Sequence, residues 1–522
     1  MKKLTALFLS TALLFSATAC TGCTNTSADT TDGTFDPTPK PTEITLNETY
    51  TLVYPSNPTD YEKAALDAIM IAMERLGITV AVQDDTKPET PNEILVGKTN
   101  RAASQNALVG LEEGGFTLAV EGSEDSGYKI VLAANDSDGI ELASRYFIWH
   151  YLNSTTPTAI PLSLPVTHKK ASVSINGIPL SDYRIVYAKE GVGGDKDIQA
   201  AKYADTVKVF QALLQKATGV QLDAIPDSQN LPSEGYYILF GSTSRPEDNI
   251  VYSSTFIRSN FNGYTVKLLN NGNIALAGSN AASTLAAAEA AVYAMLGSNG
   301  TVETINRSGK KDMLRVACIG DSITYGTNSN DPSMQSYPVY LQRMLGYDYY
   351  VEKYGAPSHS LIETDTPSFL KHDYFKKSTN TKPDVVIVML GTNDCRTQKW
   401  ADSAYKDWRD PKRKEAFLAS GRKLIDAYRK ANPDVQIIFS TCPTVPQDAW
   451  LGTDWTARIR QYGNPNIKAL AERNNCPVID IYTYSTKHPE MFTGGDGLHP
   501  QNEQYEILAQ GVYDMIKDVI KK

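Results

Sequence analysis

The C-terminal part of the sequence alternates short apolar runs with amphipathic stretches, and this pattern most constrains the fold. The apolar runs are Leu314 to Ile319, Tyr349 to Lys353, Val385 to Leu390, Val435 to Ser440 and Val478 to Tyr482. Continuous apolar strands separated by helices are typical of a parallel sheet that is buried on both faces. We therefore expect residues 313–522 to form one α/β domain, with functional groups at the carboxyl ends of its strands.

Polar segments follow three of these runs, and a fourth polar segment precedes the last expected helix, which begins near Gln501. The segments are Gly320-Asp321-Ser322, Tyr354-Gly355-Ala356, Gly391-Thr392-Asn393-Asp394 and Gly495-Asp496-Gly497-Leu498-His499-Pro500. In this order they resemble the sequence blocks of the SGNH (GDSL-type) hydrolase family. The resemblance implies a three-layer α/β/α, flavodoxin-like fold and a serine hydrolase activity. A G-x-S-x-G elbow is absent around Ser322, which argues against the α/β-hydrolase fold.

The residue types in these segments fit nucleophilic catalysis by a serine. A serine hydroxyl becomes a good nucleophile when an imidazole takes its proton, and a carboxylate holds that imidazole in the required tautomer. Asp496 and His499 are three residues apart on one glycine-containing loop. We therefore predict a catalytic triad of Ser322, His499 and Asp496. Asp321 and Asp394 are expected to fix their loops by hydrogen bonds.

The family resemblance also implies an oxyanion hole. Its donors would be the backbone N–H groups of Ser322 and Gly355 and the side-chain amide of Asn393, which can donate without acting as a base. This chain departs from the family pattern near Gly355, because Lys353 and Ser358 stand where family members usually carry Asn and Gly. We therefore expect the oxyanion glycine to be retained in a loop of altered local geometry.

The N-terminal half contains an internal repeat. The segment Glu93 to Arg101 aligns with Tyr237 to Arg245 at an offset of 144 residues, and both share an apolar strand followed by G-x-T-x-R. Each copy is expected to contain a strand, an amphipathic helix, a second strand, a hairpin and a closing helix. The sequence therefore predicts two small α+β domains, residues 47–155 and 176–299. We expect Arg101 and Arg245 to secure the corner between strand and loop.

These two copies resemble the accessory domain at the N-terminus of bacterial α-glucuronidases and family 20 hexosaminidases. In those enzymes a glycosidase barrel of some 250 residues follows. Here the segment after the repeats is shorter than such a barrel and carries the different pattern described above. A glycosidase with paired carboxylates is therefore not expected.

The start of the chain has the form of an export signal. Met1-Lys2-Lys3 is basic, Leu4 to Phe15 is apolar, and small residues precede Cys20. This segment is similar to a bacterial lipoprotein signal, which implies a signal peptide over residues 1–20 and a lipid anchor on Cys20. Residues 21–46 are rich in Thr, Ser, Asp and Pro and are expected to form a flexible tether. We expect an extracytoplasmic, cell-surface protein, with simple secretion as the alternative.

Charge and cysteine content limit the partners and cofactors. A net charge of -9 gives no basic field for nucleic acid, so no nucleic-acid partner is expected. Four cysteines lie outside the leader, and their spacing matches neither a zinc site nor a redox pair. These are Cys318, Cys395, Cys442 and Cys476. We expect them to be free thiols, and we expect no metal and no organic cofactor.

The most specific function that these observations favour is a serine esterase acting on acylated carbohydrate. It would remove small O-acyl groups, above all acetyl, through an acyl-enzyme, and Trp400 is the best candidate for stacking on a sugar ring. Two alternatives stay open. One is a lipase, lysophospholipase or thioesterase of the same fold that prefers longer acyl chains. The other is a glycan-binding surface lipoprotein with an inactive hydrolase domain.

Overall fold

The structure is a computed structural model, and it describes ten segments of the chain. These are residues 41–152, 159–170, 173–189, 198–229, 234–245, 257, 259–297, 300–396, 407–446 and 455–520. The expected signal peptide with Cys20, most of the expected tether and the expected stacking residue Trp400 lie outside the described residues. Among the residues that are described, no helix has both the length and the apolar character needed to cross a bilayer.

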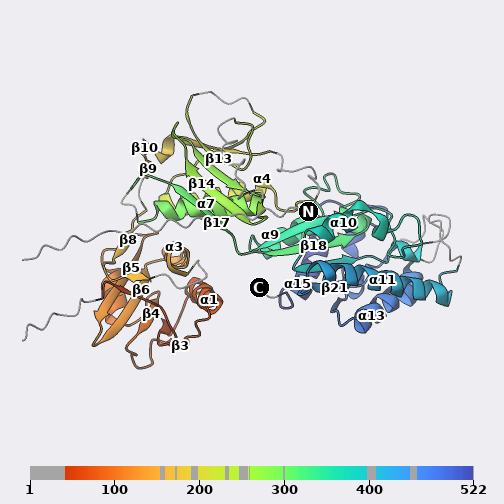
Figure 1. Ribbon diagram of the computed structural model, residues 1–522, viewed down its shortest axis with the longest axis horizontal. Helices are drawn as coiled ribbons and strands as arrows, with labels where there is room; N and C mark the ends of the chain where they lie inside the picture. The colour runs from red at the N-terminus through yellow and green to blue at the C-terminus, as the bar shows by residue number, and fades with distance from the viewer. Residues whose placement is uncertain are drawn as a thin grey trace, which may run out of the picture. The chain divides into compact units, whose positions relative to one another are not determined.

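The C-terminal sheet has five parallel strands in the order β19-β18-β20-β21-β22. Figure 1 labels β18 and β21 of this sheet. The strands are β18 (Leu314–Gly320), β19 (Tyr349–Gly355), β20 (Val385–Met389), β21 (Gln436–Ser440) and β22 (Val478–Ile479). Strand β18 lies between β19 and β20, so its carboxyl end has a neighbour on each side. The α/β class predicted for this part of the chain is confirmed.

Side chains alternate between the two faces of this sheet, as they do in any strand. Ala317 and Ile319 pack in one core with helices α11 (Pro411–Ala431) and α13 (Asn464–Arg473). Val316 and Cys318 pack in a second core with α9 (Tyr337–Leu345) and α15 (Gln504–Ile516). The domain therefore has three layers, α/β/α.

The end of the domain differs from the sequence expectation at two places. The fifth strand stops at Ile479 instead of reaching Tyr482, because helix α14 (Ile481–Lys487) begins there. Asp480 caps this helix, and its carboxylate accepts the backbone N–H of Thr483 at 3.2 Å. The last helix, α15, begins at Gln504 and not near Gln501. At Asp480 the apolar pattern continues across the helix cap, so the pattern alone does not locate that boundary.

Shorter helical elements complete this part of the chain. They are α8 (Ser322–Tyr325), η4 (Phe369–Lys371), α10 (Asp373–Asn380), η5 (Asn393–Cys395), α12 (Trp455–Arg458), η7 (Ile459–Gly463) and η8 (Pro489–Phe492).

The N-terminal half contains two six-stranded sheets with the same strand order. The first is β3-β2-β4-β6-β5-β8 and the second is β12-β11-β13-β15-β14-β17. In each sheet the first four strands are parallel, the fifth runs antiparallel to both of its neighbours, and the sixth therefore runs in the same direction as the first four. The shared order supports the duplication inferred from the sequence offset, and the boundaries 47–155 and 176–299 remain predictions.

The bounds of these strands are as follows. The first sheet comprises β2 (Thr51–Tyr54), β3 (Ala81–Asp84), β4 (Glu93–Val96), β5 (Phe116–Ser123), β6 (Gly127–Ala134) and β8 (Val166–His168). The second comprises β11 (Tyr183–Tyr187), β12 (Ala224–Pro226), β13 (Tyr236–Phe240), β14 (Gly263–Leu268), β15 (Ile274–Gly278) and β17 (Asn306–Lys310). Smaller elements are β1 (Glu43–Ile44), η1 (Ile148–Leu152), β7 (Ile160–Pro161), β9 (Ser174–Ile175), β10 (Ile178–Pro179), η2 (Leu180–Asp182) and β16 (Thr301–Val302).

Helices cover both faces of the first sheet. Helices α1 (Asp60–Arg75) and α3 (Ser137–Phe147) pack on the face that carries Leu52 and Ile94. The short helix α2 (Ala102–Leu108) packs on the opposite face, where Ala103 contacts the cluster of Val53 and Leu95. Helix α2 was not predicted, because its seven residues carry too few apolar side chains for a helical period. The corresponding helices of the second copy are α4 (Tyr203–Thr218), which follows β11, and α7 (Ala281–Met295), which follows β15.

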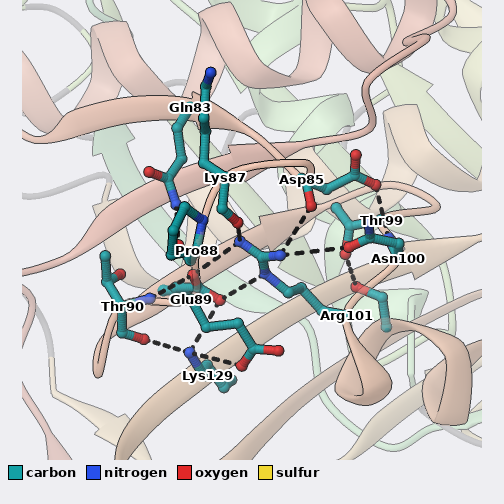
Figure 2. Close-up of polar contacts among 12 residues, drawn as sticks. Gln83, Asp85, Lys87, Pro88, Glu89, Thr90, Thr99, Asn100, Arg101 and Lys129 are labelled. Atoms are coloured by element: carbon teal, nitrogen blue, oxygen red, sulfur yellow. Dashed lines mark hydrogen bonds and ion pairs between the residues drawn. The ribbon is translucent and has the colours of Figure 1, made fainter.

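Arg101 secures the corner that was predicted for it. Its side chain is buried, and its Nε lies 3.2 Å from Oε2 of the fully buried Glu93. The guanidinium also donates to the carbonyl oxygens of Asp85 and Lys87, each at 2.9 Å (Figure 2). In the second copy Tyr237 stands at the position of Glu93, and Arg245 lies 4.4 Å from the centre of its ring. The two copies therefore stabilise the same corner by different chemistry.

Candidate active site

Ser322 lies at a tight strand-to-helix turn. Strand β18 ends at Gly320, Asp321 caps helix α8, and Ser322 is the first residue of that helix. A side chain at position 320 would collide with Thr324 and with the backbone of Met389, so the turn requires glycine there. As the first helical residue, Ser322 has an N–H without an acceptor inside the helix. The turn therefore presents both the hydroxyl and the backbone N–H of Ser322 at the edge of the sheet.

A hydrogen-bonded chain joins the three residues of the predicted triad. His499 Nε2 lies 2.8 Å from Ser322 Oγ, and His499 Nδ1 lies 2.7 Å from Asp496 Oδ2. The His499 ring is buried. Because a carboxylate can only accept, Nδ1 donates to Asp496, and Nε2 is then free to accept the serine proton. The structure thus brings together all three residues that the sequence singled out, in an order suited to proton transfer.

The loop that carries Asp496 fixes its charge. Burial alone would raise the pKa of the Asp496 carboxyl, but hydrogen bonds from the His499 ring and from backbone N–H groups lower it to about 2. The backbone donors are the N–H groups of Leu498 and His499, at 3.0 and 2.8 Å from Oδ1. Asp496 therefore remains ionised and holds the histidine ring from the same turn.

Asn393 is buried beside the serine loop. Its Nδ2 donates to Asp321 Oδ2 at 3.2 Å and to the carbonyl oxygen of His359 at 3.1 Å. Both amide hydrogens therefore have acceptors in this structure, at distances near the long end for N–H···O bonds. Donation to an oxyanion requires one of these long bonds to be shared or released.

Gly355 is the last residue of β19 and pairs with Gly320. A side chain at position 355 would collide with the backbone at Tyr325, within helix α8. Glycine at this position therefore allows the end of β19 to approach the turn that carries Ser322. This close approach explains why the predicted oxyanion glycine is retained.

Lys353 and Ser358 are the two departures from the family pattern, and Lys353 has a clear structural role beside the serine loop. This side chain is buried, and its ammonium group donates to the carbonyl oxygens of Tyr325 and Pro332 at 3.0 and 2.6 Å. Lys353 thus ties the loop after Ser322 to strand β19. Ser358 has a φ of 69°, a backbone conformation that glycine adopts more readily.

Two buried aspartates support the loops, as expected. Asp321 Oδ1 accepts the N–H of Ile323 at 3.0 Å, and the two oxygens of Asp394 accept the N–H groups of Leu361 and Ile362, each at 2.9 Å. Burial raises the pKa of Asp321 to about 6, and burial together with the charge of a neighbouring aspartate raises the pKa of Asp394 to about 6.

Arg413 is a supporting residue that the sequence analysis missed. Its Nη2 lies 3.1 Å from Asp365 Oδ2 and donates to the carbonyl oxygen of Asp394 at 2.8 Å. Both side chains are buried. Arg413 therefore holds the turn that carries Asn393. No local signal marked it, because it sits in the basic run Lys412-Arg413-Lys414, which reads as a solvated helix face.

A buried tryptophan and free cysteines also belong to this domain. Trp455 is buried, and its indole N–H donates to the carbonyl oxygen of Thr392 at 3.0 Å, so it packs beneath the site. Within the described segments, the cysteines are free, as expected for all four. In the same segments no three His, Cys, Asp or Glu side chains are grouped so that they could hold a metal ion.

Sequence comparison relates the C-terminal part of the chain to known proteins. The model of the "GDSL-like Lipase/Acylhydrolase family" matches residues 318–507. An acetylxylan esterase of Xylanibacter ruminicola is 26% identical over 219 residues, which are 40% of this chain and 44% of the relative. The chain therefore matches less than half the length of this curated relative.

Solved structures of low sequence identity also resemble this part of the chain. The lipase/acylhydrolase from Enterococcus faecalis is 22% identical with a TM-score of 0.29, and the match covers 40% of this chain and 98% of that one. Est24, a carbohydrate acetylesterase from Sinorhizobium meliloti, is 18% identical with a TM-score of 0.30, and the match covers 40% of this chain and 100% of that one.

The family match begins at Cys318, within β18, and ends at Ile507, within α15. It therefore includes the segments that carry Ser322, Asn393 and His499. Residues 318–507 of this chain are therefore similar to the GDSL-like lipase/acylhydrolase family.

Proposed function

We propose that the protein is a serine esterase that removes O-acetyl groups from carbohydrate. The observation that carries the proposal is the hydrogen-bonded chain from Ser322 through His499 to Asp496. The similarity to an acetylxylan esterase over 219 residues supports acetyl as the acyl group and a glycan as its carrier. We assign the catalytic roles to these three residues and the oxyanion donors to Ser322, Gly355 and Asn393.

In the proposed reaction His499 takes the proton of Ser322 while Oγ attacks the carbonyl carbon of the acetyl ester. The negative charge on the carbonyl oxygen is stabilised by the oxyanion donors. The bond to the sugar oxygen then breaks, and His499 gives its proton to that oxygen. A water molecule, deprotonated by His499, attacks the acetyl-enzyme, and acetate leaves with regeneration of Ser322.

Hydrolysis of p-nitrophenyl acetate tests the reaction. Ser322→Ala should lower kcat by at least 10³-fold, because the nucleophile is removed. Ser329→Ala is the matched control, since Ser329 lies in the same loop region and its hydroxyl bonds only the carbonyl oxygen of Gly326. Wild-type turnover by Ser322→Ala would overturn the proposal.

Two substrate series test the specificity. p-Nitrophenyl esters of increasing acyl length should be hydrolysed fastest as the acetate, and faster cleavage of long acyl chains would favour a lipase- or thioesterase-like enzyme. Acetate release from a panel of acetylated polysaccharides should identify the glycan. Glycan binding without any ester turnover would favour an inactive hydrolase domain.

We propose that Trp400 stacks on the sugar, which Trp400→Ala tests through KM on the polymer.

We further propose that the protein is exported and anchored by a lipid on Cys20, and that residues 47–155 and 176–299 are accessory domains similar to those of bacterial α-glucuronidases. The basic start, the apolar run and the small residues before Cys20 support the anchor. Mass spectrometry of the N-terminal peptide from membrane fractions tests it. A soluble product with an unmodified cysteine would favour simple secretion.

A further inference from the structure

A second cavity with polar walls lies in the first six-stranded sheet, far along the sequence from the hydrolase domain. Its volume is about 390 Å³, within the range of roughly 300–1,000 Å³ that is usual for small-molecule sites. The walls come from residues that follow three parallel strands. They are Pro55, Ser56, Asn57 and Thr59 after β2, Lys98 after β4, and Asn135, Asp136 and Ser137 after β6. The cavity therefore lies at the carboxyl edge of the sheet.

The topology of the sheet explains why the cavity forms there. The neighbouring strands β2 and β4 are followed by helices on opposite faces, because α1 packs with Leu52 and α2 packs with Val53 and Leu95. The two connections therefore diverge as they leave the sheet. Such a divergence at the carboxyl ends of parallel strands opens a crevice, which is the usual place for a ligand in α/β folds.

The carboxylates of the cavity build its walls. Glu62 Oε1 accepts the N–H of Lys98 at 3.0 Å, and Asp85 accepts the N–H groups of Ser56 and Asn100 at 2.9 and 2.7 Å. These bonds to backbone N–H groups fix the loops and leave further lone pairs on each carboxylate. The walls are therefore held in place before any ligand arrives.

Other lining side chains have unused hydrogen-bonding capacity. In the described part of the chain, the side chains of Asn57, Lys98 and Ser137 make no hydrogen bond or ion pair. Tyr61 also lines the cavity and has 55% of its surface exposed. Amide, ammonium and hydroxyl groups beside an exposed aromatic ring form a surface that suits a ligand with many hydroxyl groups and an apolar face.

The second copy of the fold carries different residues at two of the positions that line the cavity. Gly97 and Gly241 end corresponding strands with φ values of 86° and 88°. Glu62 packs against Gly97, whereas the ring of Tyr203, a residue only 3% exposed, packs against Gly241. In the second copy, buried Ala281 stands in place of Ser137. The polar lining therefore belongs to the first copy alone at these positions.

We propose that this cavity binds a neutral sugar residue of the glycan that carries the ester, an inference that rests on the proposed function. Sugar hydroxyls donate to the carboxylates and accept from Asn57 and Lys98, while one sugar face lies on Tyr61. Glu62, Asp85 and Asp136 outnumber Lys98, so an anionic sugar is repelled. The first accessory copy would thus tether the polymer to the chain that carries the esterase.

Calorimetric titration of the full chain carrying Ser322→Ala tests the proposal without ester turnover. Xylohexaose and cellohexaose are the neutral probes, and oligogalacturonate is the acidic probe. We expect a neutral probe to bind, and the double substitution Asn57→Ala and Lys98→Ala to weaken binding at least tenfold. Lys208→Ala is the matched control, because it removes the same charge from an exposed position on α4. Ser137→Trp, which fills the cavity, should also abolish binding.

Three results would overturn the proposal. They are no binding of either neutral probe, equal binding by the parent and by both cavity variants, and binding of the acidic probe alone. Circular dichroism shows whether each variant is folded. In the enzyme with Ser322 intact, the cavity substitutions should leave kcat for p-nitrophenyl acetate unchanged. A lack of p-nitrophenyl acetate hydrolysis by the protein with Ser322 intact would refute the esterase proposal instead, and the titration would still report on the cavity.

Discussion

The buried corner at Arg101 provides a quantitative prediction. Substituting Arg101 by Met removes two guanidinium contacts to the Glu93 carboxylate, at 3.2 and 3.3 Å, and two bonds to backbone carbonyls. Glu93 is 0% exposed, so its charge cannot turn to water. Loss of one partner of a buried ion pair costs about 3–5 kcal/mol. Lys129 Nζ remains 3.0 Å from Glu93, so we expect the lower end, about 3 kcal/mol.

Hydrogen–deuterium exchange measures this change locally. Because 1.4 kcal/mol corresponds to a factor of ten, Arg101→Met should speed exchange of the β4 amides about 100-fold where exchange reports the opening equilibrium. The second copy supplies the control. Arg245 lies over the ring of the buried Tyr237, a cation–π contact worth up to about 2 kcal/mol, so Arg245→Met should speed exchange in β13 by a smaller factor than Arg101→Met does in β4.

Two results would refute this reasoning. One is an equal change in the two copies, which would mean that burial of the Glu93 charge does not control the effect. The other is unchanged exchange in β4 of Arg101→Met. The variant Glu93→Leu with Arg101→Met separates charge from packing. It should recover part of the loss, because an uncompensated carboxylate is no longer buried.

Three further predictions concern the hydrolase domain. Asp321→Asn should lower kcat for p-nitrophenyl acetate about 10²-fold, because an amide in place of the acceptor oxygen turns the side chain of Asn393 away. An unchanged kcat would exclude a role for Asp321 in orienting Asn393. Asp496→Asn should lower kcat about 10⁴-fold, since an amide no longer holds His499 in the tautomer that accepts from serine; a loss below tenfold would contradict the triad. Asp394 has a pKa raised to about 6 from 3.8 by burial, so its stabilising effect is complete below pH 3.8 and is lost as pH rises through 6. The free energy of unfolding of the wild type should therefore fall relative to that of Asp394→Asn between pH 4 and 7, as measured by urea midpoints. A difference between the two proteins that stays constant with pH would contradict this prediction.

The strands of the hydrolase domain were predictable because burial on both faces gives each a continuous apolar run. Strand β18, which carries the turn to Ser322, was expected at Leu314 to Ile319 and observed at Leu314–Gly320. Boundaries at the end of the chain were wrong, because the cap at Asp480 interrupts an apolar pattern that continues into a helix. Helix α2 was missed for the opposite reason, since its burial depends on the sheet and not on its own periodicity.

The triad was predictable from residue types, but its supports were not. Ser322, His499 and Asp496 each belong to a distinctive local segment, and the topology of a parallel sheet predicts that strand ends meet. Arg413 and Lys353 belong to no such segment. Their partners are backbone carbonyls of loops distant in the sequence, which only the folded chain brings near. Trp400 and Cys20 lie outside the described residues, and their roles stay predictions.

The two accessory copies show how one fold diverges at positions that share a place in the sheet. Position 93 in the first copy carries a buried carboxylate, and the matching position 237 carries a tyrosine, yet an arginine contacts each of them. A carboxylate in a closed site needs a paired cation, whereas an aromatic ring needs none. The first copy therefore depends on Arg101 far more than the second depends on Arg245. The copies also differ at the strand ends, where Glu62 packs against Gly97 in the first copy and the ring of Tyr203 packs against Gly241 in the second. Duplication thus preserved the sheet order while each copy acquired its own lining, which is why binding is expected of one copy only.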